Sequence, residues 1–169
     1  MGIAPVGIVN AGHPKAASAQ AQELGSLIHT GDMAFCQDGA AAIASAVAAA
    51  FIPSTTIDAI LDAATAHLKP ISGKEMHDLI ADALKLARET GDYDAFRTEY
   101  HNRFRRAIAC DSRETVPAAL SLCLLAQGNV EKAVTFAANF GRDTDTIAAM
   151  AGAICGAYQG ASSIPTEWL

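Results

Sequence analysis

An alanine-rich stretch at residues 38–51 constrains the fold of this chain more than any other feature. It carries small apolar side chains on nearly every face of a helix, and such a helix must be surrounded by other elements. The 51% hydrophobic content of the chain comes mostly from alanine, and only 6% of the residues are aromatic. Because alanine favours closely packed helices, and because no stretch alternates like a β-strand, we predict an all-α fold with this helix at its centre.

Capping residues and helical periodicity predict about eight helices in a single domain over residues 1–169. The residues expected to open or cap these helices are Pro14, Thr55, Ser72, Asp92, Pro117 and Asn129. The helix after Pro14 is expected to place Leu24 and Ile28 on its buried face, and Gly91 is expected to end the helix that follows Ser72. The polar residues 110–115 are expected to form a loop.

Charge and composition restrict the partners. A net charge of −6 and a pI near 5.2 argue against nucleic acid, whose backbone calls for a basic face. A solvated helix face accounts for the one basic cluster, Arg97, Arg103, Arg105 and Arg106. The apolar runs near residues 39–52 and 147–158 are shorter than the roughly 18 residues of a membrane-spanning helix.

Cysteine usage and the N-terminal sequence predict a cytoplasmic location. Cys36, Cys110, Cys123 and Cys155 show no zinc-site spacing, and all but Cys110 lie in apolar helical contexts. They are therefore expected to be reduced thiols of a soluble cytoplasmic protein. No charged segment precedes the first apolar residues, so no signal peptide is expected.

The run at residues 139–148 is the strongest candidate for a functional site. Asp143 and Asp145 alternate with Thr144 and Thr146 between a glycine and an apolar segment. Oxygen-only side chains at this density are what a hard divalent cation such as Mg²⁺ selects. Asp and Thr are also favoured at helix N-termini, and on local grounds alone a helix start is the favoured interpretation.

Several runs, in order, resemble the second half of the ADP-ribosylglycohydrolase family. They are residues 3–7, 28–30, 115–119, 139–152 and 164–165, and the Asp-Thr-Asp-Thr run leading into a small-residue helix is the most specific of them. The resemblance implies an all-α, metal-dependent hydrolase that cleaves a glycosidic bond at the anomeric carbon of ADP-ribose. It implies two Mg²⁺ or Mn²⁺ ions, and an ADP-ribosylated protein or an ADP-ribose-containing small molecule as substrate.

Carried over to this sequence, the resemblance makes Asp143, Asp145 and Thr146 metal ligands, with both aspartates counted as catalytic. His29 would line the substrate pocket, although a structural histidine at a helix end is an equal alternative. Val116 would lie under the adenosine, or else pack at a helix start. Many family members have glycine at the position of Arg142, whose guanidinium would reach a ligand phosphate or carboxylate, or else pair with Asp143.

The chain resembles only the C-terminal half of the family's domain, without the N-terminal half that carries a Thr-Asp-Asp metal run. We therefore expect that half as a possible separate partner chain, and weak metal binding with little or no hydrolysis by the 169-residue chain alone. The alternative is a catalytically silent helical module that binds a nucleotide or a protein. A third hypothesis, a helical repeat array, rests only on the similarity of the turns at residues 91–96 and 128–133.

Overall fold

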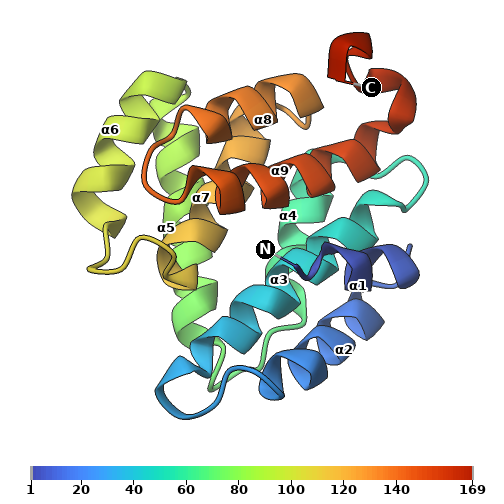
Figure 1. Ribbon diagram of the computed structural model, residues 1–169, viewed down its shortest axis with the longest axis vertical. Helices are drawn as coiled ribbons and strands as arrows, with labels where there is room; N and C mark the ends of the chain where they lie inside the picture. The colour runs from blue at the N-terminus through green and yellow to red at the C-terminus, as the bar shows by residue number, and fades with distance from the viewer. Residues whose placement is uncertain (1, 169) are drawn as a thin grey trace.

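The computed structural model describes residues 2–168, and within that range the chain forms nine α-helices, three short 3₁₀-helices and no β-strand (Figure 1). The predicted all-α fold is confirmed. The α-helices are α1 (Ala4–Val9), α2 (Pro14–Ser26), α3 (Phe35–Ala50), α4 (Ile57–Ala66), α5 (Lys74–Thr90), α6 (Tyr93–Phe104), α7 (Ser112–Leu125), α8 (Val130–Ala138) and α9 (Thr144–Gln159), and the 3₁₀-helices are η1 (Gly31–Met33), η2 (Ala161–Ser163) and η3 (Thr166–Trp168).

Helix α3 is the centre of the fold, as the alanine-rich stretch predicts. It contacts α1, α2, α4, α5, α7 and α9, and every residue from 41 to 50 is buried. The helical segment Gly31–Ala50 passes a length and hydropathy test for a membrane span, but 67% of its most apolar window is buried within the fold. The expectation that the apolar run is too short is therefore wrong for this segment, whose composition and burial are those of a core helix packed on all sides.

Several predicted helix ends are confirmed. The Asp92 side chain accepts hydrogen bonds from the backbone N–H groups of Asp94 and Ala95, and Asn129 accepts one from Lys132. Gly91 ends α5 in the left-handed conformation, with φ of 61°. These are the positions where local sequence chemistry decides the backbone.

Two predicted caps are wrong. Thr56 rather than Thr55 caps α4, through a 3.2 Å hydrogen bond that its hydroxyl accepts from the N–H of Ala59. Ser72 does not cap α5, because the helix begins one residue later and has Gly73 at its N-cap without a side-chain hydrogen bond.

The start of α7 and the face of α2 also differ from expectation. Helix α7 begins at Ser112 with Asp111 as its cap, so Pro117 lies inside the helix and residues 112–115 are helical rather than a loop. Leu24 and Ile28 are 43% and 77% exposed, because Gly25 takes the inward position and lets α2 approach the backbone of α3 at Gln37.

Helices α8 and α9 lie side by side near the C-terminal end of the chain (Figure 1). A Cβ added to Gly152 would lie 3.1 Å from a methyl of Val134, and one added to Gly156 would lie 4.0 Å from a methyl of Val130. The small residues of α9 therefore bring the two helices close together, as predicted. This packing fixes the start of α9, where the aspartate run lies.

Candidate functional site

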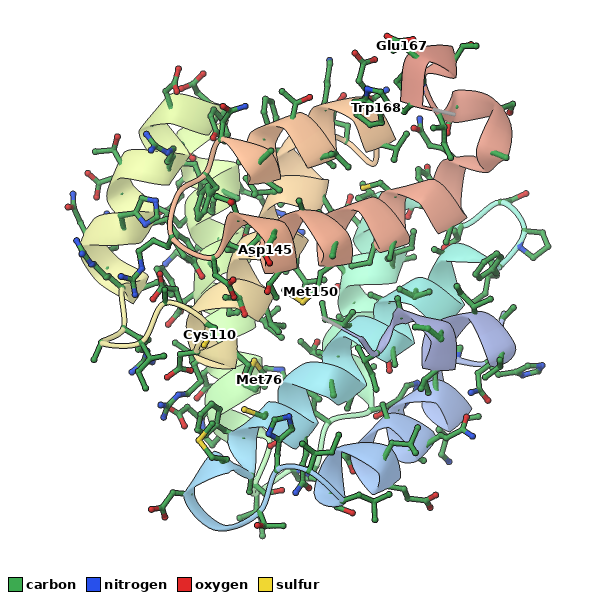
Figure 2. The ribbon with its side chains drawn as sticks, in the orientation of Figure 1. Met76, Cys110, Asp145, Met150, Glu167 and Trp168 are labelled. Carbon is green, nitrogen blue, oxygen red and sulfur yellow. The ribbon has the colours of Figure 1, made fainter. Side chains whose placement is uncertain are left out.

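A cavity of about 400 Å³ opens beside the first turn of α9. Four of the predicted site residues line it: His29, Val116, Asp143 and Thr146. They come from the segment after α2, from α7 and from the start of α9, so the fold brings together residues more than a hundred positions apart. Figure 2 shows Met150 on α9 and Cys110 just before α7, and both also line this cavity.

Asp143 stands at the N-cap position of α9 but does not act as a cap. Its side chain accepts no backbone hydrogen bond there, and its Oδ2 atom is buried without a hydrogen-bond partner among the described residues. Burial raises the pKa of the Asp143 carboxyl, and a hydrogen bond with Thr146 opposes this rise while the neighbouring Asp145 adds to it. A buried, unpartnered carboxylate oxygen in a residue that lines a cavity is unfavourable unless something binds it.

Asp145 and Thr146 complete the oxygen cluster, in different surroundings. Thr146 lines the cavity with Asp143, whereas Asp145 is exposed on the first turn of α9 (Figure 2). The cluster contains only oxygen donors, which suit a hard divalent cation. Over residues 2–168, no group of three or more His, Cys, Asp or Glu side chains lies close enough to hold a metal ion. The residues therefore fit part of a metal site, with two carboxylates and one hydroxyl.

Arg142 pairs with Glu114, not with Asp143. Its Nε donates to Oε1 of Glu114 at 2.6 Å, and its Nη2 donates to Oε2 at 3.0 Å. Nη2 also donates to the backbone carbonyl of Arg106 at 2.6 Å. The salt bridge with Asp143 that the sequence suggested is therefore absent from these contacts, and a role for Arg142 in substrate binding stays a prediction.

Glu114 is the site residue that the sequence did not reveal. Its side chain is only 3% exposed, and in addition to Arg142 it accepts the backbone N–H of Arg106 at 2.7 Å. Its own carbonyl accepts the hydroxyl of Tyr100 at 2.6 Å. Local sequence gives one signal only, a glutamate in the third position of α7, where a solvent-exposed carboxylate is the usual outcome.

The carbonyl of Phe140 anchors the run from the other side. Arg97 Nε donates to it at 2.7 Å, and His101 Nε2 lies 2.8 Å from it. Both residues come from α6; Arg97 is otherwise exposed, as the solvated-face interpretation predicts, and His101 is half-buried. The turn before α9 is held by side chains from α6 and α7 together.

The rest of the lining is mainly apolar, with His29, Ser112 and Thr115 as its polar side chains. Val116 is 3% exposed and lies against Gly39 of α3, where a Cβ added to the glycine would approach its methyl to 3.2 Å. His29 is held by its backbone, whose carbonyl accepts a 2.6 Å hydrogen bond from Gln37 Nε2. Val116 therefore packs in the core and also faces the cavity, so both roles considered for it remain compatible.

Comparisons with known proteins place the chain beside enzymes of ADP-ribose chemistry. The sequence model of one family, ADP-ribosylglycohydrolase, matches residues 1–169. Uncharacterized protein YegU of Escherichia coli (strain K12) is 51% identical over 51 residues, which are 30% of this chain and 15% of that protein. ADP-ribosylhydrolase ARH3 of Danio rerio is 51% identical over 41 residues, or 24% of this chain and 11% of that protein. The human ARH3 is 45% identical over 40 residues, again 11% of its length.

The aligned segments thus span less than a sixth of these curated relatives. No solved structure matches the chain.

Proposed function

The chain belongs to the ADP-ribosylglycohydrolase family, and from this premise we propose that it supplies part of the active site of a metal-dependent hydrolase. The reaction is hydrolysis of the glycosidic bond between ADP-ribose and an acceptor. Water adds to the anomeric carbon of the ribose, the bond from that carbon to the acceptor breaks, and the acceptor leaves with a proton.

One observation carries this proposal: Asp143 lines the cavity and its Oδ2 is buried without a partner among the described residues, next to Asp145 and Thr146. A helix cap would use that oxygen for a backbone N–H, and a structural ion pair would use it for a cation of the protein. Neither is present among the described residues. A bound divalent cation would satisfy it, and its positive charge would favour the ionised carboxylate.

In this proposal Asp143, Asp145 and Thr146 are ligands of a binuclear Mg²⁺ or Mn²⁺ site. When bound, the cations act as Lewis acids towards substrate oxygens and lower the pKa of water. Asp143 would hold negative charge at the wall, with the exposed Asp145 beside it, and the Thr146 hydroxyl would orient Asp143. The apolar side chains of Val116, Ile43 and Met150 in the cavity lining would limit the access of water to the site.

For the substrate we propose ADP-ribose attached to a protein or to a small molecule. A cavity of about 400 Å³ with an apolar wall and a few polar groups is of the kind that holds a nucleotide-sized ligand. Val116 would contact its base, and His29 and Arg142 would bind its polar groups. The net charge of −6 does not favour nucleic acid as the acceptor.

The three protein donors would satisfy only part of two octahedral coordination spheres. We therefore propose that the remaining ligands come from water, from the substrate and from a second polypeptide segment that carries further carboxylates. Such a segment is the protein partner that we expect for the chain. On its own, the chain should bind metal weakly and hydrolyse little substrate.

Metal titration tests this proposal. Isothermal titration calorimetry with MnCl₂ should give weak binding to the unmodified chain and no binding to Asp143→Asn. The control is Asp94→Asn, because Asp94 is an exposed aspartate in the first turn of α6, matching Asp145 in the first turn of α9. Equal Mn²⁺ binding by the chain and Asp143→Asn would contradict the assigned ligands, and rapid ADP-ribose release by the chain alone would contradict the partial site.

The second candidate is a catalytically silent helical module that binds a nucleotide or a protein. It is favoured by the absence, over residues 2–168, of a group of three or more metal-binding His, Cys, Asp or Glu side chains. This module should bind ADP-ribose with an affinity that neither Mn²⁺ nor Asp143→Asn changes. A strong dependence of ADP-ribose binding on Mn²⁺ would exclude it.

A further inference from the structure

We propose that Glu114 is a positioning residue for the aspartate run, and that it acts through Arg142. The proposal rests on the function proposed above, because it concerns the direction in which Asp143 faces the cavity. Glu114 contacts neither Asp143 nor the cavity, since its carboxylate is bound by Arg142 and by the backbone N–H of Arg106. Its effect on the site must therefore pass through the backbone of Arg142.

Arg142 has an uncommon backbone conformation for an arginine. Its φ is 67°, in the left-handed region where the Cβ of an ordinary residue crowds the following carbonyl. Asp143 follows it directly, so the φ and ψ angles of residue 142 set the direction of the next peptide and of the Asp143 side chain. If residue 142 relaxed to a right-handed conformation, Asp143 would turn away from the cavity wall.

The guanidinium of Arg142 holds this conformation in place. It makes two parallel hydrogen bonds to Glu114, at 2.6 and 3.0 Å, and a third to the carbonyl of Arg106 at 2.6 Å. A bidentate arginine–carboxylate pair fixes the orientation of both groups, and this pair is largely shielded from solvent, with side chains 17% and 3% exposed. Three bonds to one guanidinium therefore offset the unfavourable left-handed backbone.

Glu114 is itself rigid. It lies in the first turn of α7, is 2% exposed as a whole residue, and its carbonyl accepts the buried hydroxyl of Tyr100 at 2.6 Å. Two residues further along the same helix, Val116 forms part of the cavity wall. Glu114 therefore ties the aspartate run at the start of α9 to α7, another helix that lines the cavity.

A double-mutant cycle separates positioning from a general structural role. Glu114→Gln keeps the size of the side chain but removes the charge that orients Arg142. Arg142→Gly removes the guanidinium and introduces the residue that adopts positive φ most readily. If Glu114 acts through Arg142, then Glu114→Gln should perturb the aspartate run when residue 142 is arginine, and much less when it is glycine.

The first readout is Mn²⁺ affinity by calorimetry. Glu114→Gln should weaken binding about 10- to 100-fold in the Arg142 background, the usual loss when a residue that orients a ligand is changed. Arg142→Gly alone should cost about two- to fivefold, because a flexible glycine must be ordered. Adding Glu114→Gln to Arg142→Gly should cost no more than about twofold further. Equal losses in both backgrounds would overturn the proposal.

The second readout needs no metal. Hydrogen–deuterium exchange of the metal-free chain should show faster exchange at residues 141–145 in Glu114→Gln, and little further change when this substitution is added to Arg142→Gly. Glu75→Gln is the matched control, because Glu75 is an exposed glutamate near the side chains of Arg106 and Arg113. It should change neither readout.

The two readouts keep the failures of the two proposals apart. The unmodified chain could bind no Mn²⁺ while Glu114→Gln speeds hydrogen exchange at residues 141–145 only when residue 142 is arginine. In that case the proposed metal site is wrong, and the positioning of residue 143 by Glu114 is supported. If the chain binds Mn²⁺ but Glu114→Gln changes neither affinity nor exchange, the metal site is supported and the positioning role is wrong.

Discussion

The close contact between α1 and α3 predicts an unusual result for a glycine-to-alanine substitution. Gly7 lies inside α1, where alanine would normally stabilise a helix by about 1 kcal/mol. A Cβ added at Gly7, however, would lie 2.6 Å from the Cβ of Val47 and 2.7 Å from the carbonyl oxygen of Ala44. Both atoms belong to the central helix, and the carbonyl oxygen cannot turn aside as a flexible side chain would.

The size of the effect follows from the displacement that the new methyl group requires. Ordinary contact needs about 3.5–4 Å between carbon atoms, so α1 would move away from α3 by roughly 1 Å. Overpacking of this kind costs about 2–3 kcal/mol, and the helix propensity of alanine offsets about 1 kcal/mol of that. We expect Gly7→Ala to lower the free energy of unfolding by about 1–2 kcal/mol, and the melting temperature by about 2–8 °C.

Gly156→Ala is the matched control. Gly156 also lies inside a helix, but its added Cβ would lie 4.0 Å from Val130, an ordinary contact. We expect this variant to gain about 0.5–1 kcal/mol. Urea unfolding followed by circular dichroism at the helix band measures both. If Gly7→Ala were as stable as the unmodified chain or more so, helix propensity would outweigh the contact and the reasoning would be wrong.

Three further substitutions test the other findings. Burial raises the pKa of the Asp38 carboxyl, so protonated Asp38 favours the folded state below the pKa of the unfolded chain, and this stability is lost as the pH rises through the pKa of the folded chain. Asp38→Asn should therefore stabilise the chain at pH 7. Urea titrations should show that this gain vanishes near pH 4. Thr56→Ala should lower the free energy of unfolding by about 1 kcal/mol because it removes the cap of α4, whereas Ser72→Ala should change it by less than about 0.5 kcal/mol. Thermal unfolding that ranked the two variants in the opposite order would contradict the assigned caps.

Most of the helical structure was predictable from local sequence. Asp92 and Asn129 act within three residues of themselves, so no distant contact is needed to know where α6 and α8 begin. The errors arose where a neighbour competed with the local signal. Ser72 satisfied a capping pattern, but α5 starts at Lys74 instead, and Pro117 could open a helix, but Asp111 opens it six residues earlier.

The exposed apolar residues at the end of α2 and just beyond it show the limit of periodicity. Leu24 and Ile28 follow the spacing of Ala17 and Ala21, which are fully buried, yet both lie on the surface. Gly25 lets α2 approach the backbone of Gln37 closely, so the side of α2 that carries Gly25 is the side that faces α3. Which of two adjacent apolar stripes faces the core depends on the partner helix, and the sequence of one helix does not contain that information.

For the site, the sequence alone determined the chemistry of the aspartate run. Alternating carboxylates and hydroxyls before a small-residue helix indicate oxygen ligation or a helix start, whatever the rest of the chain does. The tertiary structure decided that Asp143 does not cap its helix, that it lines a cavity shared with His29 and Val116 while its Oδ2 is buried without a partner among the described residues, and that Arg142 binds Glu114. The physical reason is range: capping and ligand type depend on neighbours along the chain, whereas burial, cavity walls and the partner of a charge depend on helices that meet only when the core is packed.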